Sequence, residues 1–111
     1  MAEQFNRSSV ALSTTTITDV YQCPTSAAIN RSVVLSCLVA NTDATSRAVT
    51  ISITDSSNVL IARLANSITI PAYASLEVVA NKIVLKQGEK IRATAGTAAT
   101  LEVTVSTLEI T

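Results

Sequence analysis

Residues 67–111 read SITIPAYASLEVVANKIVLKQGEKIRATAGTAATLEVTVSTLEIT, and apolar residues alternate there with Ser, Thr and charged residues almost throughout. A period of two puts successive side chains on opposite faces of a strand. The intervals between the alternating runs contain turn residues, namely Pro71, Gly88 and Gly96. The stretch therefore predicts several β-strands, each with one buried and one solvated face.

The same pattern extends toward the N-terminus, and no segment has the apolar spacing of a helix. Further strands are expected at Thr14–Tyr21, Arg31–Ala40, Arg47–Thr54 and Val59–Leu64. Arg31–Ala40 is apolar on both faces, which predicts a central strand that is covered on both sides. The sequence thus predicts an all-β, antiparallel β-sandwich, jelly-roll-like or Greek key, of about eight strands.

Two irregularities interrupt this pattern. Residues 1–12 have little periodicity, and we expect an extended N-terminal arm there, outside a single sandwich domain at 13–111. Such an arm is disordered in an isolated chain, or pairs with a neighbouring sheet or groove in an assembly. At the other end, Leu108 and Ile110 are out of phase with Leu101 and Val103, which predicts a β-bulge near Ser106–Thr107.

The composition limits the kinds of partner. The chain has 111 residues, enough for one domain, and its net charge is +0. The chain has no basic run that could neutralise phosphates, and only 3% of its residues are aromatic. We therefore do not expect it to bind nucleic acid. No apolar run reaches the length of a membrane-spanning helix, and the first residues do not read as a secretory signal, so no membrane is expected and the product folds in a cytoplasm.

The hydrophobic fraction is 48% and only 14% of residues are charged. Two interpretations remain open at this point. Part of the weakly charged surface meets another protein, or the small aliphatic residues simply fill the sandwich.

Two cysteines, Cys23 and Cys37, have no metal-ligand spacing and no histidine to complete a site. Cys37 is in phase with Val33, Leu35 and Val39, as expected for a buried thiol that acts as a small hydrophobe. We expect both thiols to be reduced in a reducing compartment, and a disulfide across adjacent strands stays open as the alternative.

The side chains that enzymes use are missing or scattered. The sequence has no histidine, which removes the commonest general base, and Lys82, Lys86 and Lys90 are expected at solvated turns or strand ends. We therefore expect no enzyme activity, no catalytic, cofactor-binding or metal-binding residue, and no cofactor. Asp55 and Asn58 could hold a weak ion, but a plain turn is the simpler interpretation, and Tyr73 is the one candidate platform for a sugar.

Three segments together resemble small virion proteins of tailed bacteriophages. They are Thr16–Pro24, then Ile70-Pro71-Ala72 with Leu76-Glu77-Val78 and Lys82–Ile91, and finally Leu101–Ile110. The likeness covers most of the chain, from about Thr14 to Thr111. The sequence departs from the usual form at Tyr73, where such proteins more often have Gly.

The resemblance implies a structural component of a tailed-phage virion, assembled in the host cytoplasm. It implies a capsid cement or decoration protein first, with a neck or tail protein as the alternative. The implied partners are the major capsid protein, or neck and tail proteins, and a homo-oligomer, with a trimer favoured. A carbohydrate-binding or receptor-binding module is the competing class of function.

Overall fold

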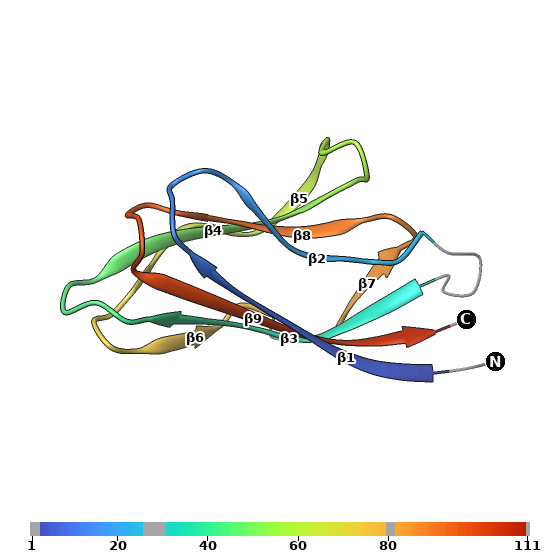
Figure 1. The fold of residues 1–111 in the computed structure, drawn as a ribbon, viewed down its shortest axis with the longest axis horizontal. Helices are drawn as coiled ribbons and strands as arrows, with labels where there is room; N and C mark the ends of the chain where they lie inside the picture. Colours follow the sequence, from blue (N-terminus) through green and yellow to red (C-terminus); the bar gives the residue numbers. More distant parts are fainter. Residues whose placement is uncertain (1–2, 26–30, 80–81, 111) are drawn as a thin grey trace.

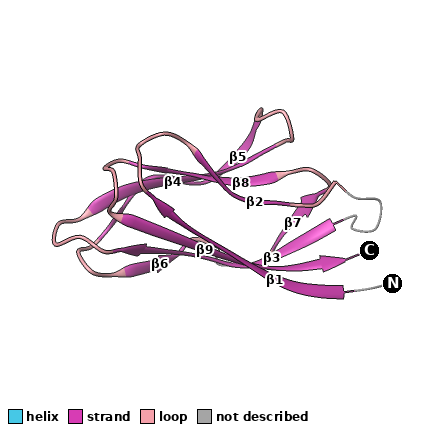
Figure 2. Cartoon of the chain, viewed as in Figure 1, coloured by secondary structure: helices cyan, strands magenta, loops and turns pink. Residues whose placement is uncertain are grey.

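The computed structural model describes residues 3–25, 31–79 and 82–110, and within them it contains nine strands in two antiparallel sheets that face each other (Figures 1 and 2). The first sheet, called sheet A, has the order β1-β9-β3, and its last position is shared by β6 and β7, which both pair with β3. The second, sheet B, has the order β2-β8-β4-β5.

The strands of sheet A are β1 (Glu3–Leu12), β9 (Leu101–Ile110), β3 (Arg31–Asn41), β6 (Ser75–Glu77) and β7 (Ile83–Lys86). The strands of sheet B are β2 (Thr18–Gln22), β8 (Lys90–Ala95), β4 (Arg47–Thr54) and β5 (Leu60–Ile70). The chain crosses between the sheets at most connections, and β6 with β7 occupies one strand position. This is the strand order of a jelly roll, so the predicted all-β sandwich is confirmed.

The core fills the space between the two sheets. Its side chains come from alternate positions, because alternation sends every second residue inward. In β9, for example, Leu101, Val103 and Val105 are buried while Glu102 and Thr104 point outward. Burying these β-branched and aliphatic residues stabilises the fold by roughly 1.5–3 kcal/mol for each large side chain.

Most of the expected arm is a strand of the domain. Glu3–Leu12 forms β1, which pairs with β9 along its whole length, from Glu3 opposite Ile110 to Leu12 opposite Leu101. The segment has little apolar periodicity because β1 is an edge strand. Its inner side has only Val10 and Leu12 as large apolar residues, and Ser8 bonds instead to the Val20 carbonyl of β2 at 2.5 Å. Residues 1–2 of the expected arm lie outside the described part of the chain.

The bulge lies on the neighbouring strand rather than in β9. The burial of β9 alternates without interruption, whereas β3 contains one extra residue, Leu35, between the pairs Val34–Thr107 and Ser36–Ser106. Leu108 and Ile110 are therefore on the outer side, opposite to Leu101 and Val103, and the prediction of a bulge in this strand near Ser106–Thr107 is wrong. The extra residue also reverses the phase of β3, so Val33 and Leu35 are not on the same side as Cys37 and Val39.

β3 is central in sheet A, as expected, but it is not covered on both sides. Val33 and Leu35 are only half buried, and Leu38 is exposed. The first strand of sheet B is also shorter than expected. It spans Thr18–Gln22, since residues 14–16 form a bend held by a Thr14 side-chain contact.

Candidate interaction surfaces

A row of apolar side chains crosses the outer face of sheet A. Residues directly opposite one another in a sheet share a face, and the register places Phe5 opposite Leu108, Leu108 opposite Val33, and Val33 opposite Val84. Phe5 is 74% exposed and Val84 is 56% exposed, while Leu108 and Val33 are half buried between them. We call these four residues the apolar row. Such a contiguous exposed row is typical of a protein-binding surface.

Cationic residues flank the apolar row. Arg31 and Lys86 are opposite each other in the next row toward the chain ends, and Arg7 is two residues from Phe5 on the same side of β1. Two exposed carboxylates of sheet A, Glu77 and Glu102, are toward its other end, whereas Glu3 is in the same row as Arg31, because both are opposite Ile110. The apolar row is therefore combined with positive charge, although the whole chain has a net charge of +0.

Beneath the row, the inner side of sheet A is partly polar. The Tyr21 hydroxyl, which comes from sheet B, donates to the buried Glu109 carboxylate at 2.5 Å and lies 2.7 Å from the Ser32 hydroxyl. Ser32 in turn donates to the Cys23 sulfur at 3.2 Å. This buried polar cluster connects the two sheets, and its hydrogen bonds offset the cost of removing a carboxylate from water.

The environment of Tyr21 suppresses its ionisation. Burial, and then the hydrogen bond to the Glu109 carboxylate, raise the pKa of Tyr21 to about 12. A phenolate at this position would lose water and face another negative charge. Tyr21 therefore keeps its proton and stays a hydrogen-bond donor throughout the physiological range, which indicates a structural role in the sandwich.

The outer face of sheet B is polar. Asp19 of β2 accepts a hydrogen bond from Arg92 Nε at 2.6 Å and one from Lys90 Nζ at 3.2 Å, and Lys90 also donates to the Asn58 side chain at 2.9 Å. Partial burial raises the pKa of Asp19, but these bonds and charges outweigh it and hold the pKa below its usual value.

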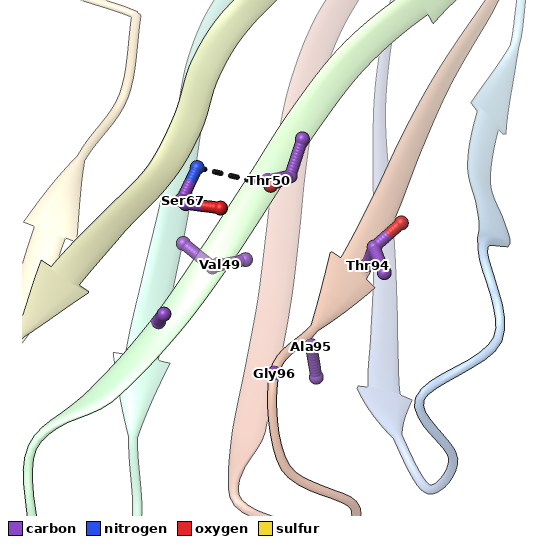
Figure 3. Close-up of a pocket in the computed structure, with 7 residues that line it drawn as sticks. Val49, Thr50, Ser67, Thr94, Ala95 and Gly96 are labelled. Carbon is purple, nitrogen blue, oxygen red and sulfur yellow. Dashed lines mark hydrogen bonds between the residues drawn. The ribbon is translucent and has the colours of Figure 1, made fainter.

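The pocket in Figure 3 is small and uncharged. It measures about 120 Å³ and is lined by β4, β5 and β8, with Ser67 on one side and Gly96 on the other. The Ser67 N–H donates to Thr50 Oγ1 at 3.0 Å, as the dashed line in Figure 3 shows. A Cβ atom at Gly96 would come within 3.3 Å of the Ala48 carbonyl oxygen, so the close approach of the two strands favours glycine. The pocket offers no reactive group.

Other residues singled out in the sequence are in separate places. Tyr73 is 73% exposed, on a turn where its φ of 56° is the left-handed conformation that glycine adopts most easily. Asp55 accepts from the Ser57 and Val59 N–H groups, as in a plain turn. Lys82 and Lys86 are exposed, whereas Lys90 is partly buried in its ion pair with Asp19.

Cys23 and Cys37 are both buried and free, as expected for the reduced state. Burial, and then the nearby Glu77 carboxylate, raise the pKa of Cys37 to about 12. Among the described residues, no three His, Cys, Asp or Glu side chains gather in a way that could hold a metal ion. The described part of the chain also has no helix with the length and apolar character needed to span a membrane.

No protein-family model and no curated protein sequence matches the chain. Solved structures do match. A chain from the disulfide-linked pili of Bacillus endospore appendages has a TM-score of 0.57 and 12% identity, over 98% of this chain and 87% of that one. A chain from the acid-stable capsid of Helicobacter pylori bacteriophage KHP30 has a TM-score of 0.56 and 9% identity, over 100% of this chain and 89% of that one.

A chain from the T13 particle of the virus IBDV has a TM-score of 0.58 and 8% identity, and here the match covers 97% of this chain but only 31% of the viral one. At such identities the likeness concerns the fold alone. The chain therefore has a fold that also occurs in viral capsids and in a bacterial pilus.

Proposed function

We propose that this protein is a structural subunit of a tailed-phage virion, and that it binds the capsid as a cement protein. The observation that carries the proposal is the apolar row on the outer face of sheet A. Phe5, Leu108, Val33 and Val84 are aligned across four strand positions, and no element among the described residues covers them. A cement protein acts by burying part of its surface against the shell. It requires an exposed apolar face of this kind and needs no catalytic group.

Two further observations support the proposal. The segments Thr16–Pro24 and Leu101–Ile110 resemble virion proteins of tailed phages. The KHP30 capsid chain is also of similar size, since 89% of it is covered by this one, so a small jelly roll of this type occurs in a phage capsid.

The mechanism is purely one of contact. A standard protein interface buries ~1,600 Å² in total, and about half of that comes from each partner. The apolar row supplies the dry centre, and Arg7, Arg31 and Lys86 supply a cationic rim toward an acidic shell surface. In a trimer, three such faces bind neighbouring shell subunits at once, and this multivalency strengthens the shell.

Two experiments test the proposal. Mass spectrometry of purified phage particles should detect this protein, and the purified protein should bind to particles from which it is missing. Replacing Phe5 and Val84 together by Ser should weaken binding by about 100-fold, because aromatic and aliphatic anchors dominate interface energies. The control replaces Tyr73 and Val59 by Ser. These residues are 73% and 60% exposed, much like Phe5 and Val84, but lie outside the row, so their loss should leave binding unchanged.

Light scattering and electron microscopy separate the two virion locations. A trimer bound all over the shell supports the cement function. A larger ring bound only at one vertex assigns the protein to the neck or tail. Particles that contain none of this chain, or equal loss of binding in both double variants, would contradict the proposal.

A further inference from the structure

β1 is the one long outer strand in the described part of the chain that offers an uninterrupted edge. It is the outermost strand of sheet A and pairs with β9 residue for residue from Glu3 to Leu12 (Figure 1). The other outer strands are short or irregular: β6 and β7 have three and four residues, β2 contains a bulge, and the pairing of β5 with β4 shifts register at three points. β1 also contains no proline and no lysine, two residues that block the pairing of an edge strand with another chain.

The first half of β1 is open to a partner strand. Its exposed residues are Gln4, Phe5, Asn6 and Arg7. The Arg7 N–H donates to the Asn6 side-chain oxygen at 2.9 Å, which indicates that this N–H faces the open edge rather than β9. Successive residues of an antiparallel strand direct their backbone groups to alternate sides. The odd-numbered residues of β1 therefore present their N–H and C=O groups at the open edge, where another strand can bond to them.

The outer face of β1 favours a second copy of the same strand as the partner. Phe5 is 74% exposed and ends the apolar row at this edge, so the row stops where the sheet stops. A second β1 that pairs antiparallel about a two-fold axis would extend sheet A. Both outer faces stay on the same side whenever odd-numbered residues are opposite odd-numbered residues. The two apolar rows then lie on one continuous face.

The residue types along β1 favour one register of this pairing. Pairing centred on Arg7 would put two guanidinium groups side by side, and like charges directly opposite destabilise a sheet. Pairing centred on Asn6 or Ser8 would move the two Phe5 residues out of opposite positions. Pairing centred on Phe5 puts the two aromatic residues opposite each other and places Glu3 of each copy opposite Arg7 of the other. Aromatic pairs and pairs of opposite charge both stabilise neighbouring strands.

We propose that β1 pairs with β1 of a second copy of this chain, with Phe5 opposite Phe5 across a two-fold axis. Sheet A then continues through both molecules. The apolar row, which crosses four strand positions in each copy, becomes one row across both. The inference goes beyond the proposed function, because it concerns a contact between copies of the chain and not a contact with a shell.

The contact is small, and its size sets its strength. About five residues of each chain are paired, from Glu3 to Arg7, whereas a standard interface involves roughly 20–30 residues on each side. We therefore expect a dissociation constant on the order of 100 μM for the free protein. Copies held side by side on a larger assembly have an effective concentration in the millimolar range, at which a contact of this strength forms.

Sedimentation equilibrium of the full chain tests the contact. The weight-average mass should rise toward twice its low-concentration value between about 10 μM and about 1 mM protein. Arg7→Glu should abolish the rise, because it puts two carboxylates opposite each other on both sides of the axis. Adding Glu3→Arg to Arg7→Glu restores opposite charges and should restore the rise. Arg63→Glu reverses an exposed charge on another outer strand, β5, and should leave the rise unchanged.

Cross-linking tests the register. Residues opposite each other in a hydrogen-bonded antiparallel pair have Cα atoms about 5.5 Å apart, which is within the range of a disulfide. Phe5→Cys should therefore form a disulfide-linked dimer under mild oxidation, and the native thiols do not compete because Cys23 and Cys37 are buried. Ser9→Cys, on the same side of the same strand, should not form one, because the two copies of residue 9 are not opposite each other in this register. Circular dichroism verifies the fold of each variant.

A mass that does not change with concentration, or an equal rise in Arg7→Glu and in the native protein, would overturn the inference. A cross-link in Ser9→Cys without one in Phe5→Cys would also overturn it. The comparison holds whether the protein at low concentration is a monomer or the trimer of the proposed function. None of these measurements involves phage particles, so the contact between copies and the binding to a shell stand or fall separately.

Discussion

The outer faces of the two sheets are built on the same alternation but differ in character. On sheet B, β4 and β8 present Thr50, Ser52, Thr54 and Arg92 outward, and the apolar partners are inside. On sheet A, in the half nearer the chain ends, one cross-strand pair of β9 and β3 is inverted. Leu108 and Val33 are outside, while Glu109 and Ser32 are buried. An apolar residue in a strand therefore indicates that its face is to be buried. It does not indicate whether the other sheet or another protein buries it.

The inward position of Glu109 requires compensation for its loss of hydration. An inward carboxylate is tolerated only if hydrogen bonds compensate its desolvation, and Tyr21 reaches across from sheet B to provide one. The apolar residues displaced outward then need an external cover. The buried polar cluster and the apolar row are thus the inner and outer sides of one arrangement.

Glu109→Ala should have the largest effect on stability. The change removes the acceptor of the Tyr21 hydroxyl and of the Asn6 side chain and leaves a void between the sheets. We expect the free energy of unfolding to fall by about 3 kcal/mol, measured by urea denaturation. Glu102→Ala, an exposed position of the same strand, should change it by less than about 0.5 kcal/mol. Similar losses in both variants would refute a special role for the cluster.

Alkaline pH should destabilise the protein through Tyr21. Its folded pKa of about 12 lies above the ordinary value of 10.0, so the folded state holds the proton more tightly than the unfolded state does. This contribution is complete below pH 10 and is lost as the pH rises toward 12. Urea denaturation at intervals across that range should show a steeper decline for the native protein than for Tyr21→Phe. Parallel declines would assign the effect to other groups, such as Cys37, whose pKa is raised to about 12 as well.

On sheet B, Thr54→Val should act in the opposite direction. Val has nearly the same shape as Thr but has no hydroxyl that lacks a partner, so we expect a gain of about 1 kcal/mol in the free energy of unfolding. A loss of stability would mean that the hydroxyl is satisfied in solution.

Asp19→Asn should have the smallest effect. The ion pairs of Asp19 are on an exposed surface, and such pairs contribute roughly 0.5 kcal/mol. The pKa of Asp19 is depressed, so this contribution is present above pH 3.8 and is lost as the pH falls through the lower folded pKa. Thermal unfolding at neutral pH with low salt and with 1 M salt should show the difference only at low salt. A larger effect that survives salt would indicate a structural role.

The sequence predicts the class of fold well and the surfaces poorly. Alternation in Arg47–Thr54 and Leu101–Val105 correctly indicates strands with one buried face, because a strand has a fixed period. The pairing of Glu3–Leu12 with β9 is not visible, since an edge strand with few inward apolar residues carries a weak pattern. The apolar row is formed by residues from four strand positions, and only the register brings them together.

The bulge at Leu35 determines which side of the first half of β3 faces the core. Judged by hydrophobicity alone, β3 would bury Val33 and Leu35 in an uninterrupted register and expose Ser32 and Val34. The observed register buries Ser32, whose hydroxyl bonds to Cys23 and Tyr21. The residues in the first half of this strand are compatible with two orientations, and the observed one forms the Ser32 hydrogen bonds and buries Val34. We expect a substitution there to change which way the strand faces, and with it what the molecule presents to a neighbour.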